Sequence, residues 1–556
     1  MDPQLSATLK KPDLMNAGDP DQETVSELSR ELVIGLVGYA GAGCSIAADR
    51  IELLLDDAGY KVHRIKLSDL IKATAGVDGV TSVSPGLKQG MESFARAEAL
   101  QNAGDLLRER HGYHAVAALA IREVMARRGS AQPGQQKLAF LLDSLKHPDE
   151  VKLLRRVYDH SFRLVAVHCE RTRRERRLIG DKRSVAKFKG VPESDVRKFM
   201  NRDEEDPRQE HGQQVRETFH IADFFLDNNT DSAGGESLTG DVDRFVNLLL
   251  GTGLVRPTRG ERAMYHAYAA ALQSSCLSRQ VGAALIAPDG TVLSTGTNDV
   301  PKFGGGVYDE ESSPDHRCFA WQWNQNDEQF VGCHNQRKKR QLQEDIAEWF
   351  ADSLSEKLAL AAHPKPATGM DTAAAARDAA ALDIRKLLRS SSGLFDRIPG
   401  IKDLIEYSRS IHAEMNALLA AGRSGVPAVN AALYCTTYPC HNCARHLVAA
   451  GIAEVYYIEP YVKSLAAELH YDAIATELLK PGADQAGRVG KMTIVPFTGV
   501  GPRMYEDFFT KRSELKDKTG AYTSPAGGVP PLAVRLSALT RVEEAAAALI
   551  PVASNE

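Results

Sequence analysis

Short apolar runs alternate with segments of helical periodicity along the first half of the chain. Because continuous apolar runs bounded by turn residues are typical of buried strands, we predict strands at 31–37, 62–67, 137–142, 162–168 and 222–226. Apolar residues recur at helical spacing between them, which predicts helices at 46–58, 95–110, 115–127 and 241–250. Strands that alternate with helices in this way predict an α/β fold with a parallel, doubly wound sheet.

The second half of the chain repeats the alternation with one long interruption. Strands at 281–287 and 291–297 flank the turn Pro288-Asp289-Gly290, and we predict further strands at 431–435 and 454–458. Helices are predicted at 263–273, 410–421 and 440–450. Residues 304–410 are too many for a simple connection, so we interpret them as an insertion with helices at 339–361 and 372–390.

These patterns divide the chain into two domains and several flanking segments. A chain of 556 residues is longer than a single hydrophobic core supports. The predicted parts are a flexible arm at 1–30, a first α/β domain at 31–250, a linker at 251–260, a second α/β domain at 261–510 and a C-terminal tail at 511–556.

Composition narrows the classes of function. Hydrophobic residues make up 43% and charged residues 25%, an ordinary globular balance, and the polar N-terminus has no apolar signal core. No apolar stretch is long enough to span a membrane, so we expect a cytoplasmic protein. The net charge of -5 argues against a long nucleic-acid groove and is compatible with a free nucleotide as substrate. Eight cysteines with uneven spacing indicate metal binding or catalysis rather than a disulfide scaffold.

A compact set of metal-binding residue types lies in the second domain. His412-Ala413-Glu414 precedes Pro439-Cys440-His441-Asn442-Cys443, and this order is typical of zinc nucleobase deaminases. One imidazole and two thiolates leave the fourth tetrahedral position of zinc for water. The predicted helix that begins at Cys440 favours thiolates through its free N–H groups. We therefore predict a catalytic Zn²⁺ site at His412, Cys440 and Cys443, with Glu414 as the catalytic proton carrier. The alternative is a structural zinc knuckle, which needs a fourth protein ligand.

Residues 261–510 resemble the deoxycytidylate deaminase branch of the cytidine deaminase superfamily. The resemblance rests on Ser275-Cys276-Leu277-Ser278-Arg279-Gln280-Val281-Gly282-Ala283, on Thr295-Gly296-Thr297-Asn298-Asp299-Val300-Pro301 and on Tyr434-Cys435-Thr436-Thr437-Tyr438. It implies a three-layer α/β/α fold, a cytosine-type substrate and a nucleotide contact at Asn298, whose alternative role is that of a turn residue. Tyr461 is a candidate for stacking on the substrate, and Lys463 is a candidate phosphate ligand or an ordinary solvated lysine.

The resemblance also suggests a second metal. Some deoxycytidylate deaminases carry a structural zinc, and the insertion contains the candidate ligands His316, Cys318, Cys333 and His334. The alternative is four unrelated loop residues.

A glycine-rich loop opens the first domain. Gly38, Gly41, Gly43, Cys44 and Ser45 lie between a predicted strand and a predicted helix, the setting in which backbone N–H groups cradle a phosphate and Ser45 holds Mg²⁺. The lysine that a kinase needs in this loop is replaced by Cys44, which speaks against phosphoryl transfer but not against nucleotide binding.

The rest of the first domain resembles the P-loop nucleoside monophosphate kinases. The resembling features are Asp143 at the end of a strand, the final strand at 222–228 and the arginines 171, 173, 174, 176 and 177, which match the lid of those enzymes. The alternative for the arginines is a solvated basic helix.

Together the two halves resemble the bacterial anti-phage deoxycytidine nucleotide deaminases. The resemblance implies deamination of dCTP and/or dCMP, a regulatory nucleotide-binding N-terminal domain, a homo-oligomer and some restraining nucleotide or inhibitor, with no membrane partner. The alternatives are a housekeeping dCMP deaminase, an RNA- or DNA-editing deaminase, which would need a basic and aromatic binding surface, and a nucleotide sensor without activity.

Overall fold

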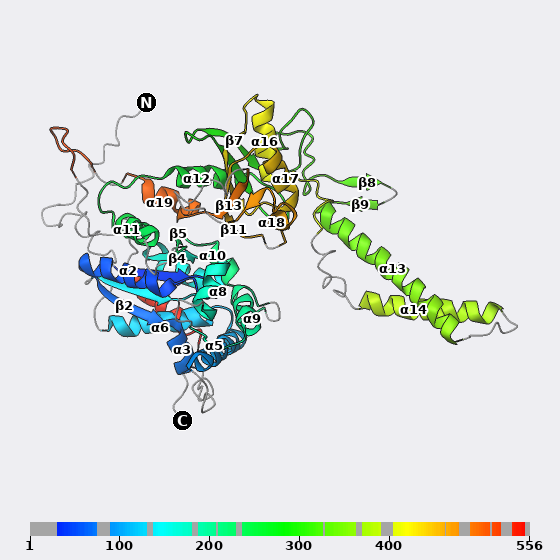
Figure 1. Ribbon diagram of the computed structural model, residues 1–556, viewed down its shortest axis with the longest axis horizontal. Helices are drawn as coiled ribbons and strands as arrows, with labels where there is room; N and C mark the ends of the chain where they lie inside the picture. Colours follow the sequence, from blue (N-terminus) through cyan, green and yellow to red (C-terminus); the bar gives the residue numbers. More distant parts are fainter. Residues whose placement is uncertain are drawn as a thin grey trace, which may run out of the picture. The chain divides into compact units, whose positions relative to one another are not determined.

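The chain forms two compact units. The computed structural model describes residues 31–74, 89–129, 137–180, 187–206, 210–229, 236–325, 328–362, 370–390, 404–461, 463–476, 490–511, 514–523 and 536–550. The predicted arm at 1–30 lies outside these residues. Unit 1 comprises Met1–Glu261 with Phe497–Glu556, and unit 2 comprises Arg262–Pro496 (Figure 1). The predicted boundary at 510 is therefore wrong, because the chain returns to unit 1 after Pro496.

Unit 1 is built on a mostly parallel sheet, as predicted. Its strands are β1 (Leu32–Val37), β2 (Lys61–Lys66), β3 (Leu138–Asp143), β4 (Phe162–His168), β5 (Phe224–Asp227) and β14 (Gly499–Val500). The order is β14-β5-β4-β1-β3-β2, and only β14 runs antiparallel to its neighbour. Since β2 and β4 lie on opposite sides of β1, right-handed crossovers place the helices that follow β1 and β3 on opposite faces of the sheet.

Helices cover this sheet and bury β1 completely. Their bounds are α2 (Cys44–Asp57), α3 (Leu67–Thr74), α5 (Gln89–His111), α6 (Ala115–Arg128), α7 (Pro148–Tyr158), α8 (Arg171–Ile179), α9 (Glu193–Glu204), α10 (Val215–Phe219), α11 (Glu236–Leu250), α19 (Tyr505–Phe509) and α20 (Leu536–Ala547). Leu32, Ile34 and Leu36 of β1 share one core with Ile51 of α2 and Phe245 of α11. The strand pattern LVIGLV is apolar throughout because both of its faces are buried.

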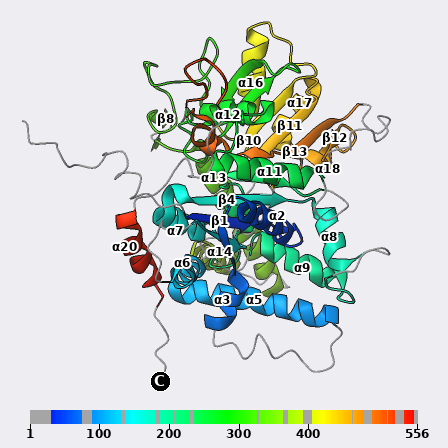
Figure 2. The ribbon, with the colours of Figure 1, turned by 90° about the vertical axis from the view of Figure 1, so that its left-hand side faces the viewer.

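The C-terminal helix α20 belongs to unit 1. It packs against α6 and α7, beside which it appears in Figure 2. Arg128 of α6 reaches Glu543 of α20 at 2.7 Å and Glu31 at 2.7 Å, and all three side chains are buried. The tail is therefore joined to the first domain by a buried ion triad, which no local sequence pattern indicated.

Unit 2 contains a mixed sheet. Its strands are β6 (Gly282–Ile286), β7 (Val292–Thr297), β10 (Ala432–Thr437), β11 (Glu454–Glu459), β12 (Ile474–Ala475) and β13 (Met492–Pro496), in the order β12-β13-β11-β10-β6-β7. The β7-β6-β10 part is antiparallel and the β10-β11-β13-β12 part is parallel. β12 and β13 were not predicted.

Two glycines let helices approach opposite faces of this sheet. Gly282 lies against the backbone of α12 (Arg259–Ala271), and Gly296 lies against the backbone of α16 (Ala413–Arg423). Gly296 pairs with Ala283, the neighbour of Gly282, and directly paired residues point to the same face. Gly282 and Gly296 therefore point to opposite faces, so α12 and α16 form two outer layers around the sheet. The predicted three-layer arrangement follows from this register.

The insertion contains the two predicted helices. They are α13 (His334–Ala362) and α14 (Met370–Ser390), which lie side by side in Figure 1 and are preceded by the small hairpin of β8 (Trp323–Gln325) and β9 (Glu328–Phe330). Among the described helices, none combines the length and apolar character needed to cross a bilayer.

Candidate metal-dependent active site

Two helix starts bring the predicted metal ligands together. His412 is the N-cap residue of α16, and Cys440 is the N-cap residue of α17 (His441–Ala449). His412 Nδ1 lies 3.3 Å from Cys440 Sγ and 3.4 Å from Cys443 Sγ. The three donor atoms lie within 4.8 Å of one another, and among the described residues they make the only such group of three or more histidine, cysteine or carboxylate ligands. One nitrogen and two sulfur donors at this spacing fit Zn²⁺.

The electrostatics of the group favour a bound cation. Hydrogen bonds from Cys443 and His412 lower the pKa of the Cys440 thiol to about 4, so its sulfur is a thiolate at neutral pH. The main-chain N–H of Cys443 also donates to Cys440 Sγ at 3.4 Å, as expected at a helix N-terminus. The hydrogen bond to Cys440 raises the pKa of His412 to about 9. The Cys440 thiolate and the His412 imidazolium thus attract each other within this group.

Glu414 lies beside this group in a dry environment. It is 4% exposed and belongs to the first turn of α16, two residues after His412. Burial raises its pKa to about 7. A carboxyl group with this pKa can both accept and release a proton near neutral pH, which is the requirement for a general acid and base.

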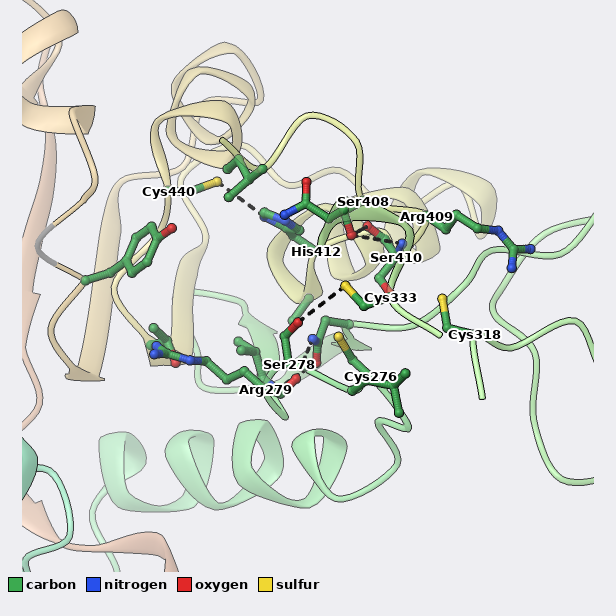
Figure 3. Close-up of a pocket in the computed structure, with 18 of the residues that line it drawn as sticks. Cys276, Ser278, Arg279, Cys318, Cys333, Ser408, Arg409, Ser410, His412 and Cys440 are labelled. Atoms are coloured by element: carbon green, nitrogen blue, oxygen red, sulfur yellow. Dashed lines mark hydrogen bonds between the residues drawn. The ribbon is translucent and has the colours of Figure 1, made fainter. Parts of the chain in front are cut away.

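A cavity of about 320 Å³ opens onto these residues. His412, Glu414 and Cys440 lie in its wall together with the predicted substrate residues Asn298, Tyr461 and Lys463. Figure 3 shows His412 and Cys440 side by side, with Ser278, Arg279 and Ser410 from neighbouring loops around them. These six predicted site residues therefore share one pocket, although they come from separate segments of the chain.

Asn298 has a structural role in the pocket wall. Its Nδ2 donates to the Arg279 carbonyl oxygen at 2.8 Å, and its Oδ1 accepts from the Val281 N–H at 2.7 Å. The amide thus ties the loop before β6 to the end of β7. Contact with a nucleotide through the remaining donor and acceptor positions stays a prediction.

Several pocket cations were missed by the sequence analysis. Arg279, Lys339 and Arg409 line the same cavity as Lys463. Arg279 pairs with Glu459 at 2.7 Å, and its guanidinium lies 6.0 Å from the centre of the Tyr461 ring. The sequence did not indicate Arg279, Lys339 and Arg409 because they come from three separate segments, and only the folded chain brings them to one cavity.

The surroundings of Arg409 indicate a binding position for a ligand. Its guanidinium lies 4.0 Å from the centre of the Trp321 ring, and its buried Nη1 has no hydrogen-bond partner among the described residues. A buried N–H that lacks a partner is costly, so this position favours an anionic or carbonyl ligand.

The predicted second metal site is not assembled. His316, Cys318, Cys333 and His334 do not form a group of metal ligands among the described residues. His316 stacks on Tyr308 and Trp321, and His334 also stacks on Trp321. Cys318 and Cys333 instead line the main pocket together with Cys276. These four residues therefore are not gathered as a metal-ligand group within the described part of the chain, and a second zinc there stays a prediction.

The glycine-rich loop of unit 1 has the predicted strand–loop–helix setting. It connects β1 to α2, and Gly41 and Gly43 have φ values of 84° and 95°, which glycine adopts without strain. Ser45 Oγ donates to Asp143 at 3.4 Å, and burial raises the pKa of the Cys44 thiol to about 12, so Cys44 is uncharged. Gly38 begins the loop.

Cations from other elements surround this loop. Lys146, from the segment after β3, donates to the Gly38 carbonyl oxygen at 3.2 Å and to Asp203 at 2.8 Å. Arg177 of α8 donates to the carbonyl oxygens of Gly41 and Ala42 at 3.2 Å and 3.1 Å. The arginine-rich helix therefore contacts the loop and is not simply solvated.

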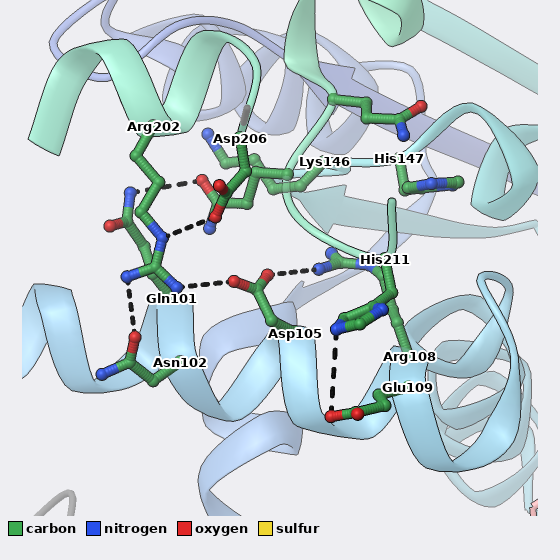
Figure 4. A network of polar contacts seen from close by, with 12 residues as sticks. Gln101, Asn102, Asp105, Arg108, Glu109, Lys146, His147, Arg202, Asp206 and His211 are labelled. Carbon is green, nitrogen blue, oxygen red and sulfur yellow. Dashed lines mark hydrogen bonds and ion pairs between the residues drawn. The ribbon is translucent and has the colours of Figure 1, made fainter. Parts of the chain in front are cut away.

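A buried polar network fixes the segment that carries Lys146 (Figure 4). Arg108 of α5 binds Glu150 at 2.8 Å and Asp105 at 3.4 Å, and Asp105 also binds Arg202 of α9 at 2.6 Å. Glu150 in turn accepts the main-chain N–H of Lys146 at 2.9 Å. The network thus joins α5, α9 and the loop after β3.

Comparisons with known proteins agree with the geometry of unit 2. Residues 257–459 match the family model of the cytidine and deoxycytidylate deaminase zinc-binding region. A stretch of 54 residues is 50% identical to ComE operon protein 2 of Bacillus subtilis and covers 10% of this chain and 29% of that protein. A stretch of 51 residues is 53% identical to the deoxycytidylate deaminase of Saccharomyces cerevisiae and covers 9% of this chain and 16% of that protein.

The matches support a dCMP/cytidine deaminase domain in the C-terminal part of the chain. They span less than a third of each of these relatives. Among solved structures, the dCMP deaminase of the cyanophage S-TIM5 is similar with 16% identity and a TM-score of 0.20, over 43% of this chain and 99% of that one.

Proposed function

We propose that this protein is a zinc-dependent deaminase of deoxycytidine nucleotides, dCTP and/or dCMP. The observation that carries the proposal is the buried Glu414 beside the donor group of His412, Cys440 and Cys443, at the wall of one cavity. The relative from Saccharomyces cerevisiae is a deoxycytidylate deaminase, which supports a cytosine base as the reacting group.

The chain's own residues account for the chemistry of hydrolytic deamination. His412, Cys440 and Cys443 would hold Zn²⁺, which supplies Lewis-acid activation of water when bound. Glu414 accepts the proton released by water and passes protons to the ring nitrogen and to the leaving amine. A C–O bond forms at C4 of the cytosine, the C–N bond to the amine breaks, and ammonia leaves.

The pocket cations support a phosphorylated substrate. Arg279, Lys339, Arg409 and Lys463 place four positive side chains around a cavity that also contains the reacting centre. Their positive charge favours a substrate that carries phosphate over an uncharged nucleoside. The net charge of the whole chain is -5, which supports a small nucleotide over a polynucleotide.

The N-terminal unit is proposed to bind a regulatory nucleotide. The glycine-rich loop, Lys146 and the Ser45–Asp143 pair supply the donor types that phosphates and Mg²⁺ require. By resemblance of the two-part architecture, depletion of dCTP in the cell would restrict phage replication. In cells that produce the protein, plaque formation should fall, and Glu414→Ala should restore it.

The direct test uses purified, zinc-loaded protein. We expect release of ammonia and uracil nucleotide from dCTP or dCMP, at least about 10²-fold slower with Glu414→Ala at unchanged zinc content. Deoxycytidine, CTP and single-stranded DNA should react poorly. Turnover of dCMP alone would favour a housekeeping deaminase, and turnover of single-stranded DNA alone would contradict the proposal.

Rivals without activity are separated by the same assay. A nucleotide sensor with structural zinc would bind nucleotides, but neither the wild-type protein nor Glu414→Ala would release ammonia. Equal activity of wild-type protein and Glu414→Ala would show that Glu414 is not the proton carrier.

A further inference from the structure

Arg64 of β2 contacts both residues that would hold Mg²⁺ beside the glycine-rich loop of unit 1. Its Nη2 donates to Asp143 Oδ2 at 3.0 Å, and Ser45 Oγ donates to the same carboxylate oxygen at 3.4 Å. Nη2 of Arg64 also donates to the main-chain oxygen of Ser45 at 3.4 Å. The positive charge of a side chain therefore lies at the carboxylate on which a metal ion would depend.

A second carboxylate holds Arg64 from the other side. Asp49, one turn after Ser45 on α2, accepts a hydrogen bond from Nη1 of Arg64. The side chains of Arg64 and Asp143 are 19% and 11% exposed, so water and salt screen their attraction only in part. Arg64 lies in β2 and Asp143 ends β3, which are neighbouring parallel strands, so the sheet itself brings the two side chains together.

These contacts fit a bound Mg²⁺ poorly. Mg²⁺ needs oxygen ligands at about 2.0–2.1 Å in octahedral geometry, usually one or two carboxylates together with phosphates and water. Ser45 and Asp143 supply suitable oxygen atoms, but Oδ2 of Asp143 already accepts two hydrogen bonds, one of them from a cation. A metal ion on this carboxylate would have to displace the guanidinium or lie against its like charge.

The charge of Asp143 would need a partner when a phosphate binds in the loop. A carboxylate beside a phosphate is repulsive unless a cation lies at both, and in phosphate-binding loops that use Mg²⁺ the ion has this role. Arg64 supplies a permanent positive charge at the same carboxylate, because arginine keeps its proton in proteins. Lys146, which donates to the Gly38 carbonyl oxygen at 3.2 Å, adds a second positive charge at the loop.

We propose that Arg64 takes over the neutralising role of Mg²⁺ at Asp143, so that unit 1 binds the phosphates of a nucleotide without a divalent cation. The inference rests on the nucleotide binding proposed for this unit and concerns its cation requirement alone. A Mg²⁺–nucleotide complex still binds, because its ion can stay on the phosphates without Asp143. Arg64 and the replacement of the loop lysine by Cys44 both favour a site that holds a nucleotide without phosphoryl transfer.

Hydrogen–deuterium exchange of the zinc-loaded full chain tests the cation requirement. The protein is titrated with ATP, GTP and dTTP, each with Mg²⁺ and in buffer freed of Mg²⁺ by a resin, since a strong chelator would also remove zinc. Exchange of the amides in residues 41–46 reports on this loop, so nucleotide bound in unit 2 does not enter the dissociation constant. For the nucleotide that protects the loop, we expect the two dissociation constants to agree within about threefold.

Two negative results have different meanings. Protection only with Mg²⁺ would overturn the role of Arg64 and leave nucleotide binding intact. No protection by any of the three nucleotides in either buffer would refute nucleotide binding by this loop, and the inference would fall with it.

Substitutions of Arg64 test whether its charge is responsible. Arg64→Met keeps much of the apolar stem and lacks the charge, so the dissociation constant should rise at least about tenfold without Mg²⁺ and much less with it. Arg64→Lys should retain binding without Mg²⁺. Arg50→Met is the matched control, because Arg50 of α2 pairs with Asp243 at 2.7 Å, and it should bind as the wild type does. Equal weakening of Arg64→Met in both buffers would contradict the proposal.

A double substitution tests the partner of that charge. Arg64→Met combined with Asp143→Asn removes the cation and the anion together, so no charge is left that needs Mg²⁺. This double variant should bind equally well in both buffers, although Arg64→Met alone depends on Mg²⁺. A double variant that still depends on Mg²⁺ would show that Arg64 does not act by neutralising Asp143.

Discussion

A Cβ atom added to Gly296 of β7 would lie 2.2 Å from the carbonyl oxygen of Ala413 in α16. It would also lie 2.4 Å from the Ala417 nitrogen, so the helix that carries His412 and Glu414 rests directly on this glycine. The backbone of α16 has no flexible end that can move aside. The position of the proposed proton carrier is thus set by the absence of a side chain on the neighbouring strand.

Gly296→Ala should therefore displace α16 and damage the site. Overpacking against a buried helix backbone costs about 1–3 kcal/mol or more, and we expect at least tenfold lower deamination with reduced zinc content. Gly422→Ala is the matched control on the same helix, where nothing lies within 4 Å of an added Cβ. It should keep its zinc and gain up to about 1 kcal/mol in stability from helix propensity. Normal zinc content in Gly296→Ala would refute this account.

Lys146→Ala should weaken nucleotide binding to the N-terminal unit. The ammonium group supplies a charge near the loop in which Cys44 replaces the usual lysine. We expect the dissociation constant for a Mg²⁺–nucleotide complex to rise by about 10-fold or more, as measured by isothermal titration calorimetry. Lys152→Ala, at a side chain that is 62% exposed, should bind normally. Equal affinity of the two variants would remove Lys146 from the site.

Asp241 should make stability depend on pH. Burial, followed by the nearby negative charge of Asp227, raises its pKa to about 6, while Arg244 opposes and Glu261 adds to the shift. Because the folded form holds the proton more tightly than the unfolded form, stability falls as pH rises from about 4 to 6 and stays lower above that. Asp241→Asn keeps an acceptor for the Asp227 N–H. Because asparagine does not ionise, this variant should not lose stability between about pH 4 and 6.

The expected result is a higher melting temperature for Asp241→Asn at pH 7.5 and little difference at pH 4. The gain at pH 7.5 should be on the order of 1–3 kcal/mol. An equal shift at both pH values would show that ionisation of Asp241 is not the cause.

Glu543→Ala should loosen the C-terminal helix from unit 1. The variant leaves the buried Arg128 with Glu31 as its remaining partner in the triad. We expect the free energy of unfolding to fall by about 2–4 kcal/mol, because a buried charge that loses a partner of opposite charge is poorly solvated. Glu544→Ala, at the exposed neighbouring position, should change stability by less than about 0.5 kcal/mol. Urea unfolding measures both, and similar midpoints would contradict the assignment.

The sequence determined the periodic elements and the local part of the site. All five predicted strands of unit 1, both insertion helices and the pairing of His412 with the Cys440–Cys443 motif follow from local apolar spacing and from ligand spacing at helix starts. Such features depend on residues that are close in the chain, so a linear pattern contains them.

Tertiary structure decided what joins distant segments. The return of the chain to unit 1 through β14, the approach of Lys146 to Gly38 and the convergence of Arg279, Lys339 and Arg409 on one cavity need contacts across large sequence separations. The same holds for the second zinc that the sequence suggested: whether His316 and His334 meet the two cysteines depends on how the insertion packs, and in the structure both rings stack on Trp321. The sequence identifies which residues can bind a metal, whereas the packing of apolar surfaces decides which of them come together in space.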